Sequence, residues 1–227
     1  MIFRQLFDPA TSTYTYLLGE AAGGAAAIVD PVREQASRDL ALIRKLDLQL
    51  RWILETHVHA DHVTGAQALK KATGAQTAVS LQCGATGFDR QLQDGEDLSF
   101  GRESLRVIAT PGHTPGSSCF LWRDRLLTGD TLLIGGCGRT DFQHGDASAL
   151  YDSITGKLFA LPDDTLVYPG HDYRGRRVST IAEERETNPR LAGVTREQFL
   201  KIMANLDLPP PKHMGEAVPA NLRGGAH

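Results

Sequence analysis

Cysteine and long hydrophobic runs are both scarce in this sequence of 227 residues. Its three cysteines (Cys83, Cys119 and Cys137) are odd in number and far apart, which argues against a disulfide framework or a paired-cysteine metal site. No segment approaches the roughly 20 apolar residues that are needed to cross a membrane. The N-terminal residues also lack the layout of a secretory signal or a transit peptide. We therefore predict a cytoplasmic protein that does not bind a membrane.

A predominance of charge of one sign is missing as well. The formal net charge is −3, with acidic and basic residues mixed throughout, so no basic surface for nucleic acid is expected. Hydrophobic residues make up 41% and charged residues 22% of the chain, which is typical of a folded globular protein. At this length, one domain spanning residues 1–227 is expected.

The hydrophobic pattern predicts strands and helices that alternate in both halves of the chain. The strands are expected at 13–19, 25–30, 52–54, 76–81, 105–109, 118–122, 126–128 and 165–169. The helices are expected at 33–46, 63–72, 147–161 and 178–187. The tail from Leu208 begins with three consecutive prolines and is predicted to be extended. Mixed strands and helices, with antiparallel hairpins in both halves, indicate two sheets covered by helices.

Polar side chains are concentrated directly after four of these strands. Three histidines and an aspartate lie within positions 57–62, immediately after the apolar run 52–54. His113, Asp130 and His171 each follow a later strand and lie next to a glycine. Because rigid strands fix the loops that follow them, we expect these four loops to converge at one edge of the sheets. Imidazole and carboxylate groups suit divalent transition metals, so the sequence predicts a metal site there.

The four loops resemble, in order and spacing, the ligand series of the metallo-β-lactamase superfamily. The matching segments are THVHADH at 56–62, PGHT at 111–114, TGD at 128–130 and GHD at 170–172. The resemblance covers roughly residues 12–175 and implies an α/β fold, the αββα sandwich, with its metals at the shared edge of the sheets. It does not identify the substrate, because the superfamily contains hydrolases, nucleases and oxygenases.

The stretch GGCGRTDFQ at 135–143 indicates one branch of that superfamily. Its GCGR element is similar to the branch that handles glutathione, which contains glyoxalase II, a thioester hydrolase, and the persulfide dioxygenases. The continuation TDFQ resembles the dioxygenases, since glyoxalase II usually continues with Phe-Glu-Gly. Three other segments also resemble the dioxygenases: PGHDY at 169–173, TNPRL at 187–191 and VPANLR at 218–223. Glyoxalase II would carry a longer helical C-terminal region than the roughly fifty residues after Tyr173.

The resemblance to the dioxygenases implies one Fe(II) per chain, held by His57, His113 and Asp130. Such a triad leaves coordination positions open for a substrate and O₂ side by side. The implied reaction oxidises glutathione persulfide with O₂ and water to sulfite and glutathione. A separate sulfurtransferase of the rhodanese type would be a source of persulfide, and a homodimer is compatible with the family.

The remaining ligands of a two-metal site, His59, Asp61, His62 and His171, are all present. Ligand identity alone therefore permits two zinc ions and a bridging hydroxide, as in a glyoxalase II-like hydrolase of glutathione thioesters. With one iron, these four residues would orient ligands and water or form a vacant second site. A non-enzymatic metal-binding or sulfur-carrier module is a weaker alternative, because structural metal sites are typically closed by four ligands that include thiolates.

Further candidates flank the predicted ligands. Arg139 is the candidate for binding a glutathione carboxylate, because a guanidinium can engage it bidentately; the alternative is an ion pair with Asp141. Tyr173 is a candidate for catalysis and substrate binding, or a residue that only caps its loop. His171 and Asp172 complete the predicted catalytic set, although Asp172 flanks a ligand and is expected mainly to hold the loop.

Overall fold

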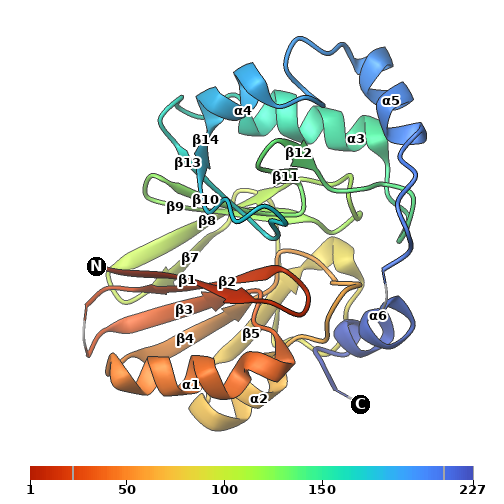
Figure 1. Cartoon of the computed structure of the whole chain (residues 1–227). Helices are drawn as coiled ribbons and strands as arrows, with labels where there is room; N and C mark the ends of the chain where they lie inside the picture. Colours follow the sequence, from red (N-terminus) through yellow and green to blue (C-terminus); the bar gives the residue numbers. More distant parts are fainter. Residues whose placement is uncertain (22, 212, 227) are drawn as a thin grey trace.

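The computed structural model describes residues 1–21, 23–211 and 213–226, and it contains four layers in the order helix, sheet, sheet, helix (Figure 1). The first sheet has the strand order β1-β2-β3-β4-β5-β6: Ile2–Asp8, Thr13–Gly19, Ala25–Val29, Gln49–Leu54, Gln76–Ser80 and Arg90–Leu92. Its outer face is covered by α1 (Ala36–Lys45) and α2 (Ala66–Thr73). The predicted αββα sandwich is thus confirmed.

The second sheet has the strand order β14-β13-β10-β9-β8-β7: Ser179–Thr180, Leu166–Pro169, Arg125–Gly129, Ser118–Trp122, Glu103–Ala109 and Asp97–Phe100. Its outer layer consists of α3 (Ala147–Asp152), which continues as a π-helical segment at Ser153–Leu158, α4 (Ile181–Thr187) and α5 (Arg196–Ala204) (Figure 1). A small hairpin joins β11 (Leu132–Leu133) to β12 (Gly136–Cys137). Short 3₁₀ turns lie at Arg33–Gln35 and Leu81–Cys83.

Strands β2 and β3 of the first sheet are buried on both faces, and their alternate residues pack in different cores. On β2, Leu18 packs between the two sheets with Phe120 and Trp122, whereas Leu17 packs on the helix side with Ile53. Successive side chains of a strand point to opposite faces, so one strand contributes to both cores. This double burial explains why the strands read as continuous apolar runs.

The strand arrangement brings the predicted site loops together. β3, β4 and β5 pair in parallel, as do β10 and β13, so the loops after these strands leave at corresponding ends. The two sheets are joined at that edge, where Tyr14 N donates to Gly170 O (2.8 Å) and Ser118 N donates to Thr56 O (2.8 Å). The predicted convergence of the loops is therefore observed.

The prediction of an extended tail from Leu208 is wrong in its second half, where α6 occupies Met214–Leu222. Proline lowers helix propensity, and Pro219 lies inside this helix, but Ala217 and Ala220 pack against Val63 and stabilise it. Lys212 and His227, which also belong to that tail, lie outside the described residues. Within the residues described, no helix is both long enough and apolar enough to span a bilayer.

Candidate metal centre

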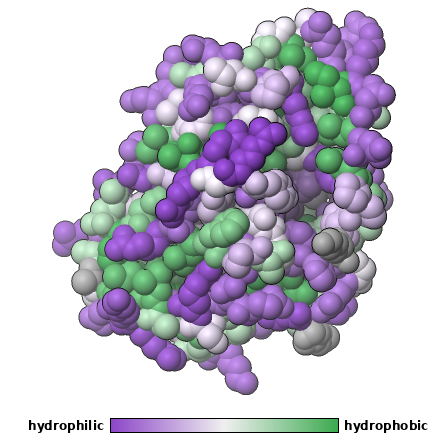
Figure 2. Space-filling model, in the orientation of Figure 1, coloured by the Kyte–Doolittle hydropathy of each residue, from purple (hydrophilic) through white to green (hydrophobic). Residues whose placement is uncertain are grey.

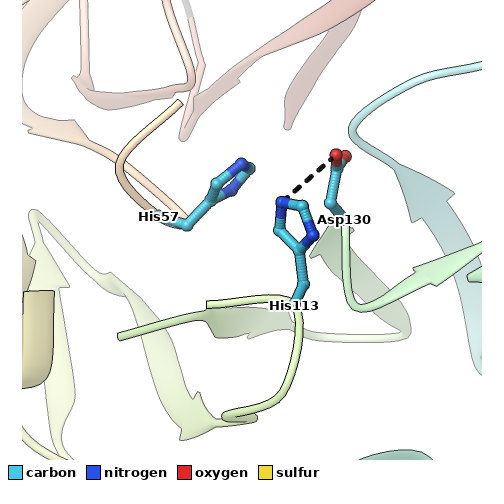
Figure 3. Close-up of side chains that lie close together, drawn as sticks. All are labelled: His57, His113 and Asp130. Atoms are coloured by element: carbon cyan, nitrogen blue, oxygen red, sulfur yellow. Dashed lines mark ion pairs between the residues drawn. The ribbon is translucent and has the colours of Figure 1, made fainter. Parts of the chain in front are cut away.

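Three donor side chains from three different loops meet at the shared edge of the sheets. His57 follows β4, His113 follows β8 and Asp130 follows β10. One donor atom of each residue lies within 4.8 Å of the other two. Figure 3 shows both imidazoles and the carboxylate directed into one common space, with His113 Nε2 at 3.7 Å from Asp130 Oδ2. The structure therefore brings together the three residues predicted as iron ligands.

Hydrogen bonds determine which imidazole nitrogen faces this space. His113 Nδ1 donates to the carbonyl oxygen of Arg139 (2.7 Å). The hydroxyl proton of Thr56 goes to Asp30, so Thr56 Oγ1 accepts from His57 Nδ1 (3.0 Å). In both imidazoles this leaves the lone pair of Nε2 for a metal.

Burial and charge also favour a cation here. Burial, together with the neighbouring His59 and His113, lowers the pKa of His57 well below its ordinary value, so its imidazole is neutral. Asp130 Oδ1 is buried and has no hydrogen-bond partner among the described residues. Such a carboxylate oxygen is costly unless it binds a cation, so the three residues fit a divalent metal.

Asp30 lies behind these ligands and is not among the residues predicted from the sequence. Its Oδ1 accepts the Thr56 N–H (2.7 Å) and lies 3.1 Å from His59 Nε2, while its Oδ2 accepts the Thr56 hydroxyl (2.8 Å). Because Thr56 in turn contacts His57, one carboxylate orients two histidines. The only sequence signal is an acidic residue directly after the apolar strand 25–29.

A second group of donors lies beside the first. Donor atoms of His59, Asp61 and His62 lie within 4.8 Å of one another. His171 Nε2 is 3.5 Å from Asp130 Oδ1 and 3.6 Å from Asp61 Oδ2, between the two groups. Although burial opposes the charged form, Asp30 and Glu55 raise the pKa of His59 well above its usual value. The four residues that could hold a second metal therefore also lie close to one another in the structure.

Arg139 is engaged in contacts within the protein. Its guanidinium pairs with both carboxylate oxygens of Asp141 (2.7 Å each), donates to the carbonyl of Pro209 (2.7 Å), and lies over the ring of Phe142. The alternative ion pair with Asp141 is thus observed. Binding of a glutathione carboxylate by Arg139 stays a prediction.

The segment after β13 presents the other predicted residues. Asp172 is buried and accepts the N–H groups of Arg174 (2.8 Å) and Arg176 (2.7 Å), an arrangement that holds the loop. Tyr173 is 76% exposed, and its ring lies parallel to that of His171 at 6.2 Å. His171 thus faces the carboxylates, whereas Tyr173 extends toward solvent.

Five of the candidate metal ligands line a cavity of about 620 Å³: His57, Asp61, His113, Asp130 and His171. Four arginines also line it: Arg139, Arg174, Arg176 and Arg190. Arg190 was not among the site residues predicted from the sequence. Its guanidinium donates to the carbonyl of Cys137 (2.7 Å). In Figure 2, hydrophilic side chains gather across the middle of the visible face of the molecule. The arginines make the cavity suited to an anionic ligand.

Gly170 provides a test of the site's packing. A Cβ atom added at Gly170 would lie 2.7 Å from Asp130 Oδ1 and 2.9 Å from the carbonyl carbon of Gly129. We expect Gly170→Ala to displace the Asp130 carboxylate and to weaken Co(II) or Fe(II) binding about tenfold or more. Metal titration checks this, with Gly156→Ala as the control because an added Cβ there meets nothing within 4 Å. Equal metal affinity in both variants would contradict the expectation.

The fold and the donor set define the class of protein. Residues 8–82 and 83–171 match the metallo-beta-lactamase superfamily, and the chain belongs to this superfamily. The match includes all four loops that carry the candidate ligands.

Comparison with particular proteins identifies the branch. The chain is 49% identical over 228 residues to the human "Persulfide dioxygenase ETHE1, mitochondrial", covering 99% of this chain and 89% of that protein. The crystal structure of ETHE1 from Myxococcus xanthus superposes with a TM-score of 0.97 at 54% identity, covering 99% of this chain and 100% of that one. A hydroxyacylglutathione hydrolase of Anaeromyxobacter dehalogenans is 45% identical, but over only 70% of this chain and 61% of the hydrolase. The resemblance to the persulfide dioxygenase branch is confirmed.

Proposed function

We propose that the protein is a mononuclear iron dioxygenase that oxidises glutathione persulfide. The observation that carries this proposal is the His57, His113 and Asp130 cluster in a chain that resembles persulfide dioxygenases over almost its whole length. Two imidazoles and one carboxylate form the donor set of non-haem Fe(II) oxygenases and leave coordination positions open. These three residues would hold one Fe(II) per chain.

The reaction converts glutathione persulfide, O₂ and water into glutathione, sulfite and two protons. Bound Fe(II) supplies the redox chemistry that joins oxygen to the terminal sulfur. The protein supplies orientation: Thr56 and the Arg139 carbonyl fix the imidazoles of His57 and His113. His171, between Asp61 and Asp130, is placed to orient a water or to hold the Asp130 carboxylate.

The arginines of the cavity account for the choice of a glutathione derivative. Glutathione carries two carboxylates, and a guanidinium binds a carboxylate through two parallel hydrogen bonds. Arg174 is exposed at the cavity, whereas Arg139 would have to exchange Asp141 for the substrate carboxylate. Tyr173 lies next to Arg174 and would contact the bound glutathione.

We expect Tyr173→Phe to raise KM for glutathione persulfide by roughly two- to tenfold with little change in kcat, because one hydrogen bond to the substrate is lost. Steady-state O₂ consumption at varied persulfide concentration measures both constants. Tyr151→Phe is the control, since the Tyr151 hydroxyl donates to the Val194 carbonyl, away from the cavity. An unchanged KM would show that the Tyr173 hydroxyl does not contact the substrate.

The decisive experiment is an oxygen-electrode measurement with iron-loaded protein and glutathione persulfide. We expect one sulfite formed for each O₂ consumed, and one iron per chain by elemental analysis. Two zinc ions per chain, hydrolysis of a glutathione thioester and no O₂ uptake would replace the proposal by the dinuclear hydrolase.

The cellular setting follows from the proposed chemistry. The reaction consumes persulfide, so we propose a separate sulfurtransferase of the rhodanese type as its source. The described cysteines are free thiols, which a reducing compartment such as the cytoplasm preserves. We also propose that the protein is a homodimer located in the cytoplasm; sedimentation of the purified protein tests the first, and cell fractionation tests the second.

A further inference from the structure

Two motifs that resemble the dioxygenases each contain a residue with no role in the site described so far: Gln143 in TDFQ (140–143) and Asn221 in VPANLR (218–223). Each contributes an amide side chain, Gln143 and Asn221, that reaches the loop 57–64. We call residues 57–64 the ligand loop, because it carries His57 and the second donor group. The ligand loop is almost entirely irregular, so its backbone polar groups need partners from elsewhere.

Asn221 binds the ligand loop at three points. Its Nδ2 donates to the carbonyls of His59 (2.9 Å) and His62 (2.8 Å), and its Oδ1 accepts the N–H of Thr64 (2.9 Å). The side chain is only 2% exposed. Asn221 belongs to α6, which the chain reaches by running down the side of the molecule from α5 (Figure 1). A buried amide with both its N–H groups and its oxygen satisfied forms a rigid connection.

Gln143, in a turn between β12 and α3, also binds the ligand loop. Its Nε2 donates to the carbonyl of Val58 (2.8 Å), which lies between His57 and His59 in the chain. The backbone of Gln143 has a φ of +48°, a left-handed conformation that is uncommon for this residue type. Sparsely populated backbone conformations are concentrated at functional sites, and here the conformation accompanies the contact of Gln143 with the ligand loop.

The segment 138–143 contacts all three loops that supply the predicted iron ligands. Gly138 N donates to the Asp130 carbonyl (2.8 Å), and the Arg139 carbonyl accepts from His113 Nδ1. Gln143 completes the set through Val58. One short segment therefore sets the spacing of ligands that come from two different sheets.

Packing around α6 holds Asn221 in place. Val218 and Leu222 pack against the cluster of Val58, Val79 and Ala85, and the Leu222 carbonyl accepts the N–H of Thr86 (2.9 Å). A Cβ atom added at Gly87 would lie 2.0 Å from the carbonyl carbon of Arg223. The C-terminal segment therefore packs so close to Gly87 that no side chain fits at position 87.

We propose that Asn221 and Gln143 are positioning residues that fix the ligand loop and thereby set the affinity and geometry of the metal held by His57, His113 and Asp130. This inference rests on the metal site of the proposed function and not on its substrate. These two side chains come from segments far apart in the sequence. Together they form hydrogen bonds with three carbonyls and one N–H of the same loop. Groups that hold metal ligands from outside typically change metal affinity 10- to 100-fold when they are removed.

The test is Co(II) titration, followed by the visible absorption spectrum of the Co(II) protein, which reports coordination geometry. We expect Asn221→Ala and Gln143→Ala each to lower Co(II) affinity by about 10- to 100-fold and to alter the spectrum. Asn221→Asp retains the acceptor for Thr64 but loses both donors, so it should lower the affinity as much as alanine does. Asn205→Ala is the matched control, because Asn205 is an exposed amide that donates to Lys201 at the end of α5.

A second pair of variants tests the docking of α6 without changing an amide. Gly87→Ala should displace the C-terminal segment and reproduce the loss of Co(II) affinity seen with Asn221→Ala. Gly215→Ala, within α6 itself, is the control, since an added Cβ there meets nothing within 4 Å. Should Asn221→Ala fail to fold, Gln143→Ala decides, because Gln143 is only half-buried.

Wild-type Co(II) affinity and an unchanged spectrum in folded Gln143→Ala, Asn221→Ala and Gly87→Ala would overturn the inference. A lowered melting temperature with unchanged Co(II) affinity would assign Asn221 a purely structural role and would overturn it as well. Wild-type protein that binds Co(II) but shows no O₂ uptake when loaded with iron overturns the proposed function alone.

Discussion

Asp130→Ala is expected to leave the protein without iron and to lower its O₂ consumption with glutathione persulfide by more than about a hundredfold. Removing a group that merely orients a ligand typically costs 10- to 100-fold, so loss of a ligand must exceed that range. Asp130 is the single carboxylate of the three-residue cluster, and its side chain also lies 3.5 Å from His171. Iron content and O₂ uptake after reconstitution measure both effects.

Two other aspartates serve as references for this result. Asp164→Ala changes an exposed carboxylate outside the cavity and should retain one iron per chain. Asp61→Ala separates the two models of the centre: with one iron at His57, His113 and Asp130, its iron content stays near one per chain. In a dinuclear centre, Asp61→Ala would instead lower the metal content from two per chain, as Asp130→Ala would.

Residues that follow apolar strands were predictable from the sequence for a physical reason. His57, His113, Asp130 and His171 each lie a few residues beyond the end of a strand, and the position of a strand end follows from local hydrophobicity. β4 runs parallel to β3, and β10 runs parallel to β13. β8 has the same direction as β10, because both pair antiparallel with β9 between them, so the ends of these strands lie at corresponding edges. Local pattern and sheet geometry were therefore sufficient to predict that the four loops converge, whereas the choice of His57, His113 and Asp130 as iron ligands came from the family resemblance.

The groups that hold the ligands were not predictable in this way. Asn221 contacts Thr64 across 157 residues, and Arg139 reaches the Leu208 carbonyl across 69. No local pattern encodes such contacts, because they depend on where separate elements pack. The helix α6 was missed for a related reason: Pro219 lowers its intrinsic propensity, and only burial of Ala217 and Ala220 stabilises it. The capping box of Thr195 and Gln198 at the start of α5 was a local signal that could have revealed that helix.

Asp30→Ala is expected to lower the free energy of unfolding of the metal-free protein by about 4 kcal/mol. The N–H and the hydroxyl of Thr56 lose their acceptor, and Nε2 of His59 loses the nearer of its two carboxylates, keeping Glu55 Oε2 at 3.3 Å. Each buried donor left without a partner costs roughly 1–3 kcal/mol, and these costs are not fully additive. Asp30 also has a φ of +51°, and alanine in that left-handed conformation costs about 1 kcal/mol more. Against a total stability of roughly 5–15 kcal/mol, this loss is large.

Asp30→Asn offsets in part both contributions to the stability lost in Asp30→Ala: the missing hydrogen-bond acceptor and the strained backbone conformation. Asparagine tolerates the left-handed conformation, and its carbonyl oxygen still accepts from Thr56, so we expect it to keep more than half of the stability that alanine loses. Urea unfolding of metal-free protein measures both variants, because bound metal would add its own binding energy to the folded state. If metal-free Asp30→Ala unfolds within about 1 kcal/mol of the wild type, the Asp30 carboxylate does not hold the loop, and the orientation of His57 must come from other contacts.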